Sequence, residues 1–353
     1  MSDLCIKPHY PKPEKGLCIV SIKLWGGLCN RLFQIACCLG YAEKYNLSPV
    51  FYKCLFEHNK HEYEYQTQNT NGENTITILK ELLPELDIRD DVVSESDFYI
   101  IDIGGDFACK YIDLQLPLHT YKNILLKGYF QSEQYFPILE SNKFLYPFVK
   151  KIITDDAIYQ NAENAENANN KYDKYDNLYF LHIRMGDYMN HYLHYLGYKK
   201  YLETSIKYIL DRNPNAVFLI CSNEKDKTKI LQELDFGTRN KNENNLLSRI
   251  KYEFEIDINP DINPLDTLKN MSMCAGGICM NSSFSWFGAY LSRVTSKYKL
   301  LLEHCKDNYI VEEKNIIKNI IIMPSKWFNN RYISIGMYQD IYPKWENLII
   351  LDI

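Results

Sequence analysis

The feature that most constrains this chain is a pattern found once in each half: an apolar, β-branched run, then a loop, then a segment with apolar residues at helical spacing. In the first half the run covers 17–25 (LCIVSIKLW), and the helical pattern covers 30–45. In the second half the run covers 178–183 (LYFLHI), and after the loop 184–198 the helical pattern covers 199–211. This alternation is typical of parallel sheets covered by helices, so two α/β domains are predicted.

The second half continues with predicted strands at 216–221 and 277–280 and predicted helices at 265–274 and 285–292. Between the halves, 161–177 (NAENAENANNKYDKYDN) contains no large aliphatic residue and cannot bury a face. It is predicted to be an exposed loop or linker, with a helical extension as the alternative because Ala and Glu favour helices. The predicted domains are therefore 1–160 and 178–353. The active site is predicted in the cleft between them.

Composition excludes several classes of protein. A hydrophobic fraction of 46% with 24% charged residues excludes a disordered chain, and 353 residues suit two domains. A net charge of -5 gives no bulk attraction to nucleic acid or anionic lipid, so bound phosphate would need a local site. We find no signal sequence and no run near ~18 apolar residues, which predicts a cytoplasmic protein without a transmembrane segment.

The cysteines predict no metal site. Most of the 11 cysteines lie in apolar segments, which is typical of reduced, buried thiols. Cys274 and Cys279 have no matching Cys or His pair at zinc spacing, so buried packing is predicted for both.

The most informative motif is 182–188 (HIRMGDY), directly after a predicted strand. Open α/β sheets bind ligands beyond the carboxyl ends of their strands, where Arg184 would lie. A guanidinium grips two phosphate oxygens and keeps its charge, which suits a diphosphate leaving group. Asp187 would orient Arg184 or cap the following turn. The alternative is an ordinary surface ion pair beside a glycine turn.

Two further motifs combine a loop with a helix start. Gly26 and Gly27 precede Asn30 and Arg31, a pattern that suits an anion or sugar-hydroxyl site, with a simple tight turn as the alternative. It matches neither a dinucleotide-binding nor a P-loop pattern. The loop 280–289 (MNSSFSWFGA) offers hydroxyls and backbone amides for phosphate, with N-capping by its serines as the alternative.

Taken together and in order, the segments GGLCNRLFQIA, GYFQSEQYF, HIRMGDY, FLICSNE and MNSSFSWFGAYLS resemble the α-1,2-fucosyltransferase family, glycosyltransferase family 11. The resemblance continues in MPSKWF and DIYPKW and so covers most of the chain. It implies a GT-B architecture of two Rossmann-like α/β domains, with GDP-fucose as the donor bound mainly by the C-terminal domain. It also implies inversion at the anomeric carbon and no metal or other cofactor.

The resemblance assigns roles to individual residues. The catalytic set is His182, Arg184 and Asp187, on the family's H-x-R-R-x-D pattern, with Arg184 neutralising the charge that grows on the diphosphate. The donor-binding set is Gly26, Gly27, Asn30, Arg31, Ser222, Asp266, Asn281, Ser282, Ser283 and Ser285. Asp266 lies near the acid expected to bind the guanine N–H edge. A general base is not assigned; Asp187, Glu133, His191 and His194 are the candidates.

The sequence also departs from the family pattern. Met185 stands where a second arginine is usual, and Thr267 stands where aspartate is common, which leaves Asp266 one residue out of register. Cys29 and Arg31 replace the usual glycine and glutamine of the first motif, and Phe287 replaces a frequent tryptophan. The missing cation at 185 implies weaker donor binding or a changed donor, the shifted acid also suits another donor, and the Phe287 replacement is conservative.

The prediction is an inverting transferase that moves fucose from GDP-fucose to a hydroxyl of a glycan acceptor with a galactoside-type terminus, forming an α-1,2 linkage. It would act in carbohydrate metabolism or protein glycosylation. One alternative is a transferase of the same fold that uses another deoxysugar donor such as GDP-rhamnose. The other is a non-catalytic glycan-binding protein.

Overall fold

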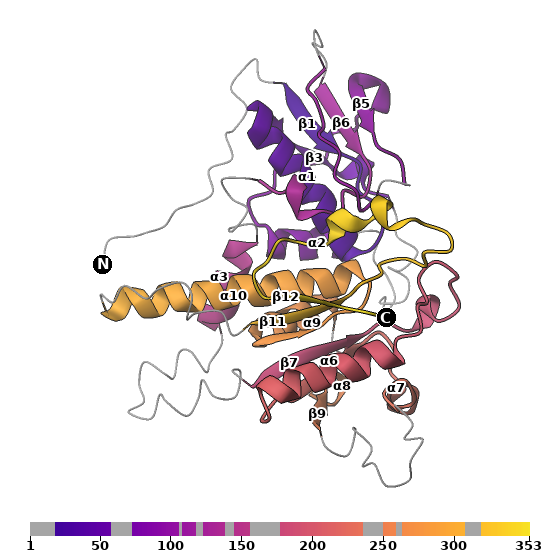
Figure 1. Cartoon of the computed structure of the whole chain (residues 1–353). Coiled ribbons are helices and arrows are strands. Elements are labelled where there is room, and N and C mark those ends of the chain that lie inside the picture. Colours follow the sequence, from indigo (N-terminus) through magenta and orange to yellow (C-terminus); the bar gives the residue numbers. More distant parts are fainter. Residues whose placement is uncertain are drawn as a thin grey trace. The chain divides into compact units, whose positions relative to one another are not determined.

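A computed structural model describes residues 18–57, 73–105, 108–117, 123–137, 145–155, 177–235, 250–258, 263–307 and 319–353 (Figure 1). The chain forms two compact units: Met1–Phe148 with Gly336–Pro343, and Val149–Ile335 with Lys344–Ile353. The predicted linker lies outside the described residues except for Asn177. The sequence analysis did not predict that Gly336–Pro343 belongs with the first unit, where the Tyr111 N–H donates to Asp340 Oδ2 over 2.9 Å.

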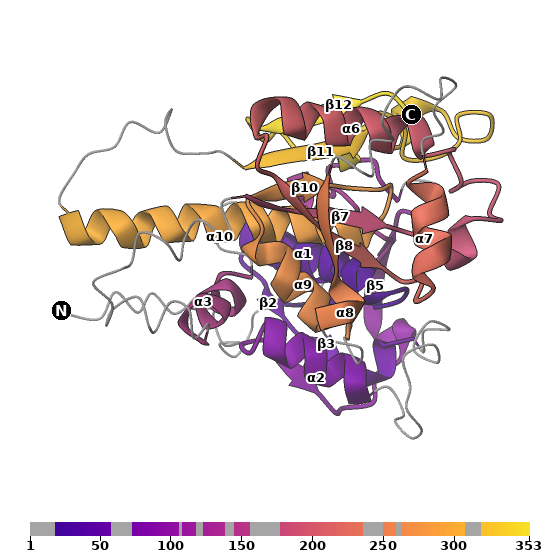
Figure 2. The ribbon, with the colours of Figure 1, turned by 90° about the horizontal axis from the view of Figure 1, so that it is seen from below.

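The second unit is built on a parallel sheet of six strands in the order β12-β11-β10-β7-β8-β9 (Figure 2). The strands are β7 (Leu178–Ile183), β8 (Val217–Ser222), β9 (Lys251–Phe254), β10 (Gly276–Ile278), β11 (Ile320–Pro324) and β12 (Leu348–Leu351). Numbered along the chain from β7, this order is 3-2-1-4-5-6 read from β9, the strand order of the Rossmann fold. The order reverses between β7 and β10, so the carboxyl ends of these two strands form the switch point where such sheets bind ligands.

Helices cover both faces of this sheet. They are α6 (Lys199–Arg212), α7 (Lys227–Glu233), α8 (Glu255–Ile258), α9 (Pro264–Met273) and α10 (Ser283–Asp307). All six residues of β7 are buried, as a central parallel strand requires. Tyr179, Leu181 and Ile183 pack in one core with Ile206 and Ile209 of α6. Alternate β7 residues therefore face α10, which lies on the opposite side of the sheet (Figure 1).

The first unit contains a parallel sheet in the order β2-β1-β6-β5. Its strands are β1 (Ile19–Ile22), β2 (Ser48–Pro49), β5 (Phe98–Asp102) and β6 (Asn123–Lys127). A two-stranded parallel sheet joins β3 (Phe51–Tyr52) to β4 (Ile88–Arg89), and the helices are α1 (Leu28–Tyr45) and α2 (Glu73–Leu82), with α3 (Tyr146–Asp155) at the boundary of the two units. Here β1 and β6 are the two central strands, and because the sheet is parallel their carboxyl ends lie side by side at one edge.

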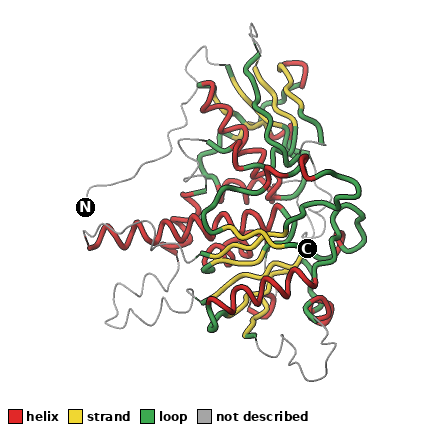
Figure 3. Tube along the Cα trace, viewed as in Figure 1, coloured by secondary structure: helices red, strands yellow, loops and turns green. Residues whose placement is uncertain are grey.

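The predicted fold class, α/β with two Rossmann-like domains, is confirmed, and strands and helices alternate along the chain as expected (Figure 3). Two helix boundaries were wrong. α1 begins at Leu28 instead of residue 30, because Gly27 already takes the N-cap position. α10 runs to Asp307 instead of ending at 292, since no Gly or Pro interrupts 289–307. In the part of the chain described, no helix is long and apolar enough to cross a membrane.

Candidate functional site

Arg184 directly follows β7, and neighbouring strands hold the backbone around it. The Ser222 hydroxyl, at the end of β8, donates to Ile183 O over 2.7 Å. The Arg184 N–H donates to Met280 Sδ, just beyond β10, over 3.0 Å. Arg184 therefore lies at the β7/β10 switch point, and Ser222 holds the backbone before it from β8, the neighbour of β7 on the other side.

Asn223 completes this arrangement, and the sequence analysis did not single it out. Its Oδ1 accepts from the Met185 N–H over 2.8 Å, and its Nδ2 donates to Met185 O over 3.3 Å. Gly186 follows with φ 66°, and a Cβ there would lie 2.9 Å from Asn223 Nδ2. The turn after Arg184 therefore requires a glycine, and the amide of Asn223 fixes both polar groups of the preceding residue.

The side chains along this turn have different environments. Arg184 is half-buried, and its guanidinium carbon lies 5.1 Å from the centre of the Tyr188 ring. Met185 is buried in the core that α6 shares with β7. A second arginine at that position would have to bury its charge, so the missing cation is replaced by core packing. Asp187 lies in the short helix η5 (Gly186–Tyr188), and its side chain lies outside the described part.

His182 and Ser285 form a buried pair between β7 and α10. His182 is only 4% exposed, and Ser285 Oγ lies 2.5 Å from its Nδ1. Ser285 Oγ also accepts the Met280 N–H over 3.2 Å, so this hydroxyl links β7 to the segment after β10. Burial, reinforced by the Arg184 charge, lowers the pKa of His182 to about 3, so the ring is neutral at neutral pH.

The remaining serines of the fifth motif differ from each other. Ser282 Oγ accepts the Phe284 N–H over 3.3 Å and so caps the start of α10. Ser283 is the first residue of α10 and is half-buried, and its hydroxyl makes no hydrogen bond with the described residues. Together with the helix N-terminus, Ser283 remains the candidate of this motif for phosphate.

Asn281 is buried and forms hydrogen bonds with two other segments of the second unit. It is 1% exposed, and its Nδ2 donates to His194 O over 3.0 Å and to Trp327 O over 2.8 Å. The Tyr198 hydroxyl oxygen lies 2.8 Å from Asn281 Oδ1. Asn281 therefore ties the loop after η5 to the segment after β11.

The acid predicted to bind guanine is half-buried at the start of α9. Asp266 Oδ2 accepts from Asn263 Nδ2 over 2.6 Å. The next residue, Thr267, donates its hydroxyl to Glu255 Oε2 over 3.1 Å, and Asn270 Nδ2 donates to Glu255 Oε1 over 2.8 Å. Burial raises the pKa of Glu255. The sequence analysis missed this carboxylate as a partner of Thr267.

In the first unit, the glycine motif and the segment after β6 meet beyond the carboxyl ends of β1 and β6. Gly26 has φ 76°, and a Cβ there would lie 2.8 Å from Asn30 Nδ2. Asn30 Oδ1 accepts from Gln131 Nε2 over 2.7 Å. Gly27 is the N-cap of α1, where no side chain caps the helix and the first turn holds no acid. The features that favour an anion at this helix start are therefore present.

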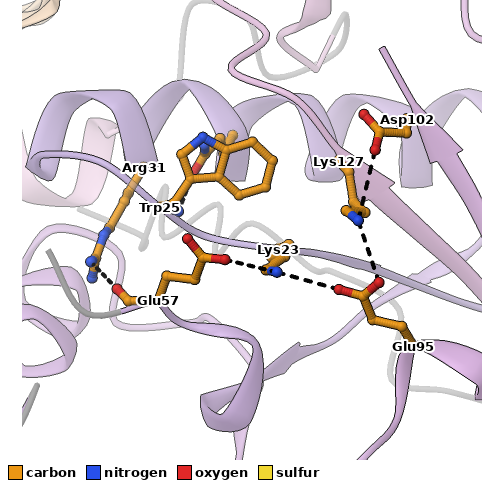
Figure 4. Close-up of polar contacts among 8 residues, drawn as sticks. Lys23, Trp25, Arg31, Glu57, Glu95, Asp102 and Lys127 are labelled. Atoms are coloured by element: carbon orange, nitrogen blue, oxygen red, sulfur yellow. Dashed lines mark hydrogen bonds and ion pairs between the residues drawn. The ribbon is translucent and has the colours of Figure 1, made fainter. Parts of the chain in front are cut away.

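Arg31 is placed differently from the prediction that it faces the donor phosphate. Its side chain is 2% exposed, its Nε donates to Gly26 O over 3.0 Å, and its guanidinium also donates to Glu57 O over 2.7 Å (Figure 4). These bonds hold the glycine turn against the segment after β3. The guanidinium is thus directed at backbone carbonyls of its own unit.

A chain of ion pairs lies at the same edge of the first sheet (Figure 4). Lys23 Nζ lies 2.7 Å from Glu57 and 3.3 Å from Glu95, and Lys127 Nζ lies 3.3 Å from Glu95 and 3.7 Å from Asp102. The hydrogen bond to Glu57 is the main cause of the raised pKa of Lys23. Burial opposes ionisation of Glu95, but hydrogen bonds from Lys127 and Lys23 lower its pKa overall. Both lysines are therefore paired with carboxylates.

The remaining candidates occupy ordinary environments. Cys274 and Cys279 are buried and donate to the helix carbonyls of Asn270 and Ser285 over 3.4 and 3.5 Å. In the ranges that the structure describes, no three His, Cys, Asp or Glu side chains gather as metal ligands would. Glu133, a candidate base, is half-buried in η4 (Glu133–Tyr135).

Comparison with known proteins places the chain beside sugar transferases. No family model matches the chain. It is 24% identical over 329 residues to an α-1,2-colitosyltransferase from Escherichia coli, covering 90% of this chain and 94% of that protein. The predicted resemblance to sugar transferases agrees with this relative.

Solved structures of low similarity include the fucosyltransferase NodZ from Bradyrhizobium, at 11% identity and a TM-score of 0.40. Another is a NodZ α-1,6-fucosyltransferase co-crystallised with GDP, at 10% identity and a TM-score of 0.34. Each alignment covers 78% of this chain and 92% of the other. The fold assigned above rests on the strand orders of the two units.

Proposed function

We propose that this protein is a glycosyltransferase that moves a deoxyhexose from a GDP-sugar to a hydroxyl of a glycan, with GDP-fucose as donor and an α-1,2 linkage as product. One observation carries the proposal: Arg184 stands at the β7/β10 switch point, on a backbone held by Ser222, Asn223 and Met280. The ordered motifs and the α-1,2-colitosyltransferase relative support the same reaction class.

The chemistry follows from these positions. The bond between the anomeric carbon and the donor phosphate oxygen breaks, and the acceptor oxygen bonds to the opposite face of that carbon. Arg184 neutralises the charge left on the diphosphate. Such a contact lowers the activation barrier by roughly 3 kcal/mol. The start of α10, with Ser283, offers N–H and hydroxyl donors to the same phosphates. The acceptor proton passes to a base or to phosphate, and the base stays open among Asp187, Glu133, His191 and His194.

A second donor has its own support. The E. coli relative is named for transfer of colitose, and fucose differs from colitose by a single hydroxyl group. Met185 and Thr267, where the motifs depart from the fucosyltransferase pattern, also favour a changed donor. GDP-colitose is therefore the second candidate, ahead of GDP-rhamnose and of a non-catalytic glycan-binding role.

The test is a donor panel. Purified protein is incubated with lactose, EDTA and either GDP-fucose, GDP-colitose or GDP-rhamnose, and the product is identified by mass spectrometry and its linkage by NMR. We expect α-1,2 transfer from one of the first two donors despite EDTA. GDP binding without release of GDP from any donor would favour the glycan-binding alternative.

A further inference from the structure

The second unit carries a cluster of exposed aromatic rings that the proposed chemistry does not use. Tyr192 is 61% exposed and Tyr332 is 58% exposed, and their ring centres lie 4.9 Å apart with the planes at 79°. We call Tyr192 and Tyr332 the tyrosine platform. Exposed aromatic side chains gathered in this way typically mark a binding surface.

Backbone hydrogen bonds set the position of this platform. The Asn329 N–H donates to Leu193 O over 2.9 Å, and Asn329 Nδ2 donates to Tyr192 O over 3.2 Å. Asn281, described above, anchors the same loop through His194 O. The rings are therefore held in place before any ligand arrives, which reduces the entropic cost of binding.

The platform is continuous with Arg184. Arg184 lies over Tyr188, and Tyr188 stacks on His194 with ring centres 4.6 Å apart and planes at 13°. His194 contacts His191 at 4.6 Å, and His191 stacks on Tyr192 at 5.2 Å and 12°. An unbroken series of rings thus joins the candidate diphosphate cation to the exposed tyrosines.

We infer that the tyrosine platform binds the glycan acceptor, an inference that rests on the proposed function. A pyranose ring has an apolar face of C–H groups and a rim of hydroxyls. Tyrosine offers a flat apolar face with a polar edge, which complements both features. An extended glycan that lies on Tyr192 and Tyr332 would follow a ring series that begins at Arg184, so its end could approach the donor.

A glycan is a better ligand for the tyrosine platform than a nucleic acid is. A net charge of -5 disfavours a nucleic acid, which would also stack on aromatic rings.

The test compares Tyr192→Ala, Tyr332→Ala and the double variant with wild type. The control is Tyr99→Ala, which removes a 45% exposed tyrosine from β5 of the first unit. Binding is measured on an array of galactose-terminated oligosaccharides, and GDP affinity is measured by calorimetry. We expect about tenfold weaker glycan binding for each single variant and near loss for the double. GDP affinity should stay within twofold for all variants, and Tyr192→Phe should retain most glycan binding.

Each other outcome is decisive. Unchanged glycan binding by the double variant, or no glycan binding by wild type, would overturn the platform. Wild-type self-association that the double variant abolishes would overturn it as well, by making the platform an interface between two copies. Absence of GDP binding by wild type would count against the proposed function, whereas loss of glycan binding alone leaves the donor site intact.

Discussion

The arginines beside β7/β10 and beside β1/β6 are held in different ways. At β7/β10, the main chain around Arg184 exchanges hydrogen bonds with the side chains of Ser222, Asn223 and Met280. At β1/β6, the guanidinium of Arg31 itself donates to Gly26 O and Glu57 O and is buried. The guanidinium of Arg31 therefore stabilises its own unit, whereas the bonds around Arg184 fix the backbone that carries the side chain.

The surrounding charges reinforce this difference. Lys23 and Lys127 in the first unit are paired with Glu57, Glu95 and Asp102 (Figure 4). Near Arg184, His182 is buried and uncharged at neutral pH and lies against the Ser285 hydroxyl. We therefore propose that the diphosphate binds in the second unit.

The largest effect is expected for Arg184→Ala, which removes the cation but not the turn. Transfer should fall by about 10²- to 10³-fold, because an interaction with developing charge is lost. Arg184→Lys should recover only part of the rate, since an ammonium lacks the two-pronged geometry. Initial rates and far-UV circular dichroism test this together. Transfer near the wild-type rate in a folded Arg184→Ala protein would sink the assignment.

The next effect is expected for Asn223, a positioning residue. Asn223→Ala and Asn223→Asp both lose the donor to Met185 O, and each should reduce kcat by about 10- to 100-fold through misplacement of Arg184. The exposed Asn215→Ala is the matched control. Separate kcat and KM values for the donor distinguish a positioning role from a structural one. A purely structural role would lower the melting temperature but would leave kcat unchanged at a temperature where the protein is folded.

Arg31→Ala should destabilise the first unit without the kinetic signature of Arg184→Ala. It leaves two carbonyls without their donor, at a cost of about 2–4 kcal/mol. Lys23→Ala, which breaks only partly exposed ion pairs, should cost below about 1 kcal/mol and less at high salt. Urea unfolding measures both. An Arg31→Ala protein of unchanged stability that no longer binds GDP would restore the phosphate role predicted for Arg31.

The smallest effect is a pH dependence of stability from His182. Its pKa is about 3 in the folded chain against an ordinary 6.5, so the unfolded chain binds an extra proton between these values. Stability is then fully present above pH 6.5 and falls as pH falls toward 3, with about 1 kcal/mol lost between pH 6.5 and 5.5. His182→Gln should remove this part of the slope in urea unfolding. An unchanged slope would show that His182 is not the neutral, buried partner of Ser285.

Local patterns predicted much of this fold. The strand at Leu178–Ile183 was predicted at its observed bounds because it is a continuous apolar run, and α6 was predicted to within one residue. The position of Arg184 beyond a buried strand was also predictable, since it needs only the strand end.

Contacts between distant segments could not be read from the sequence. Asn223 meets Met185 only because β7 and β8 are neighbours in the sheet, 38 residues apart along the chain. The burial of Arg31 was missed because arginine is usually exposed, and its carbonyl partner Glu57 follows a different strand. The sequence predicted that Ser285 binds phosphate. It is instead buried against His182, a contact that depends on how α10 packs on the sheet and that the sequence does not show.

The most direct test of the assignment to the second unit is calorimetric titration of GDP, with UDP and ADP as controls and EDTA present, into wild type, Arg184→Ala and Lys23→Ala. The expected result is selective GDP binding by wild type, retained within about twofold by Lys23→Ala and weakened by at least about tenfold in Arg184→Ala. GDP binding that survives in Arg184→Ala but is lost in Lys23→Ala would contradict the assignment and place the diphosphate at the carboxyl ends of β1 and β6.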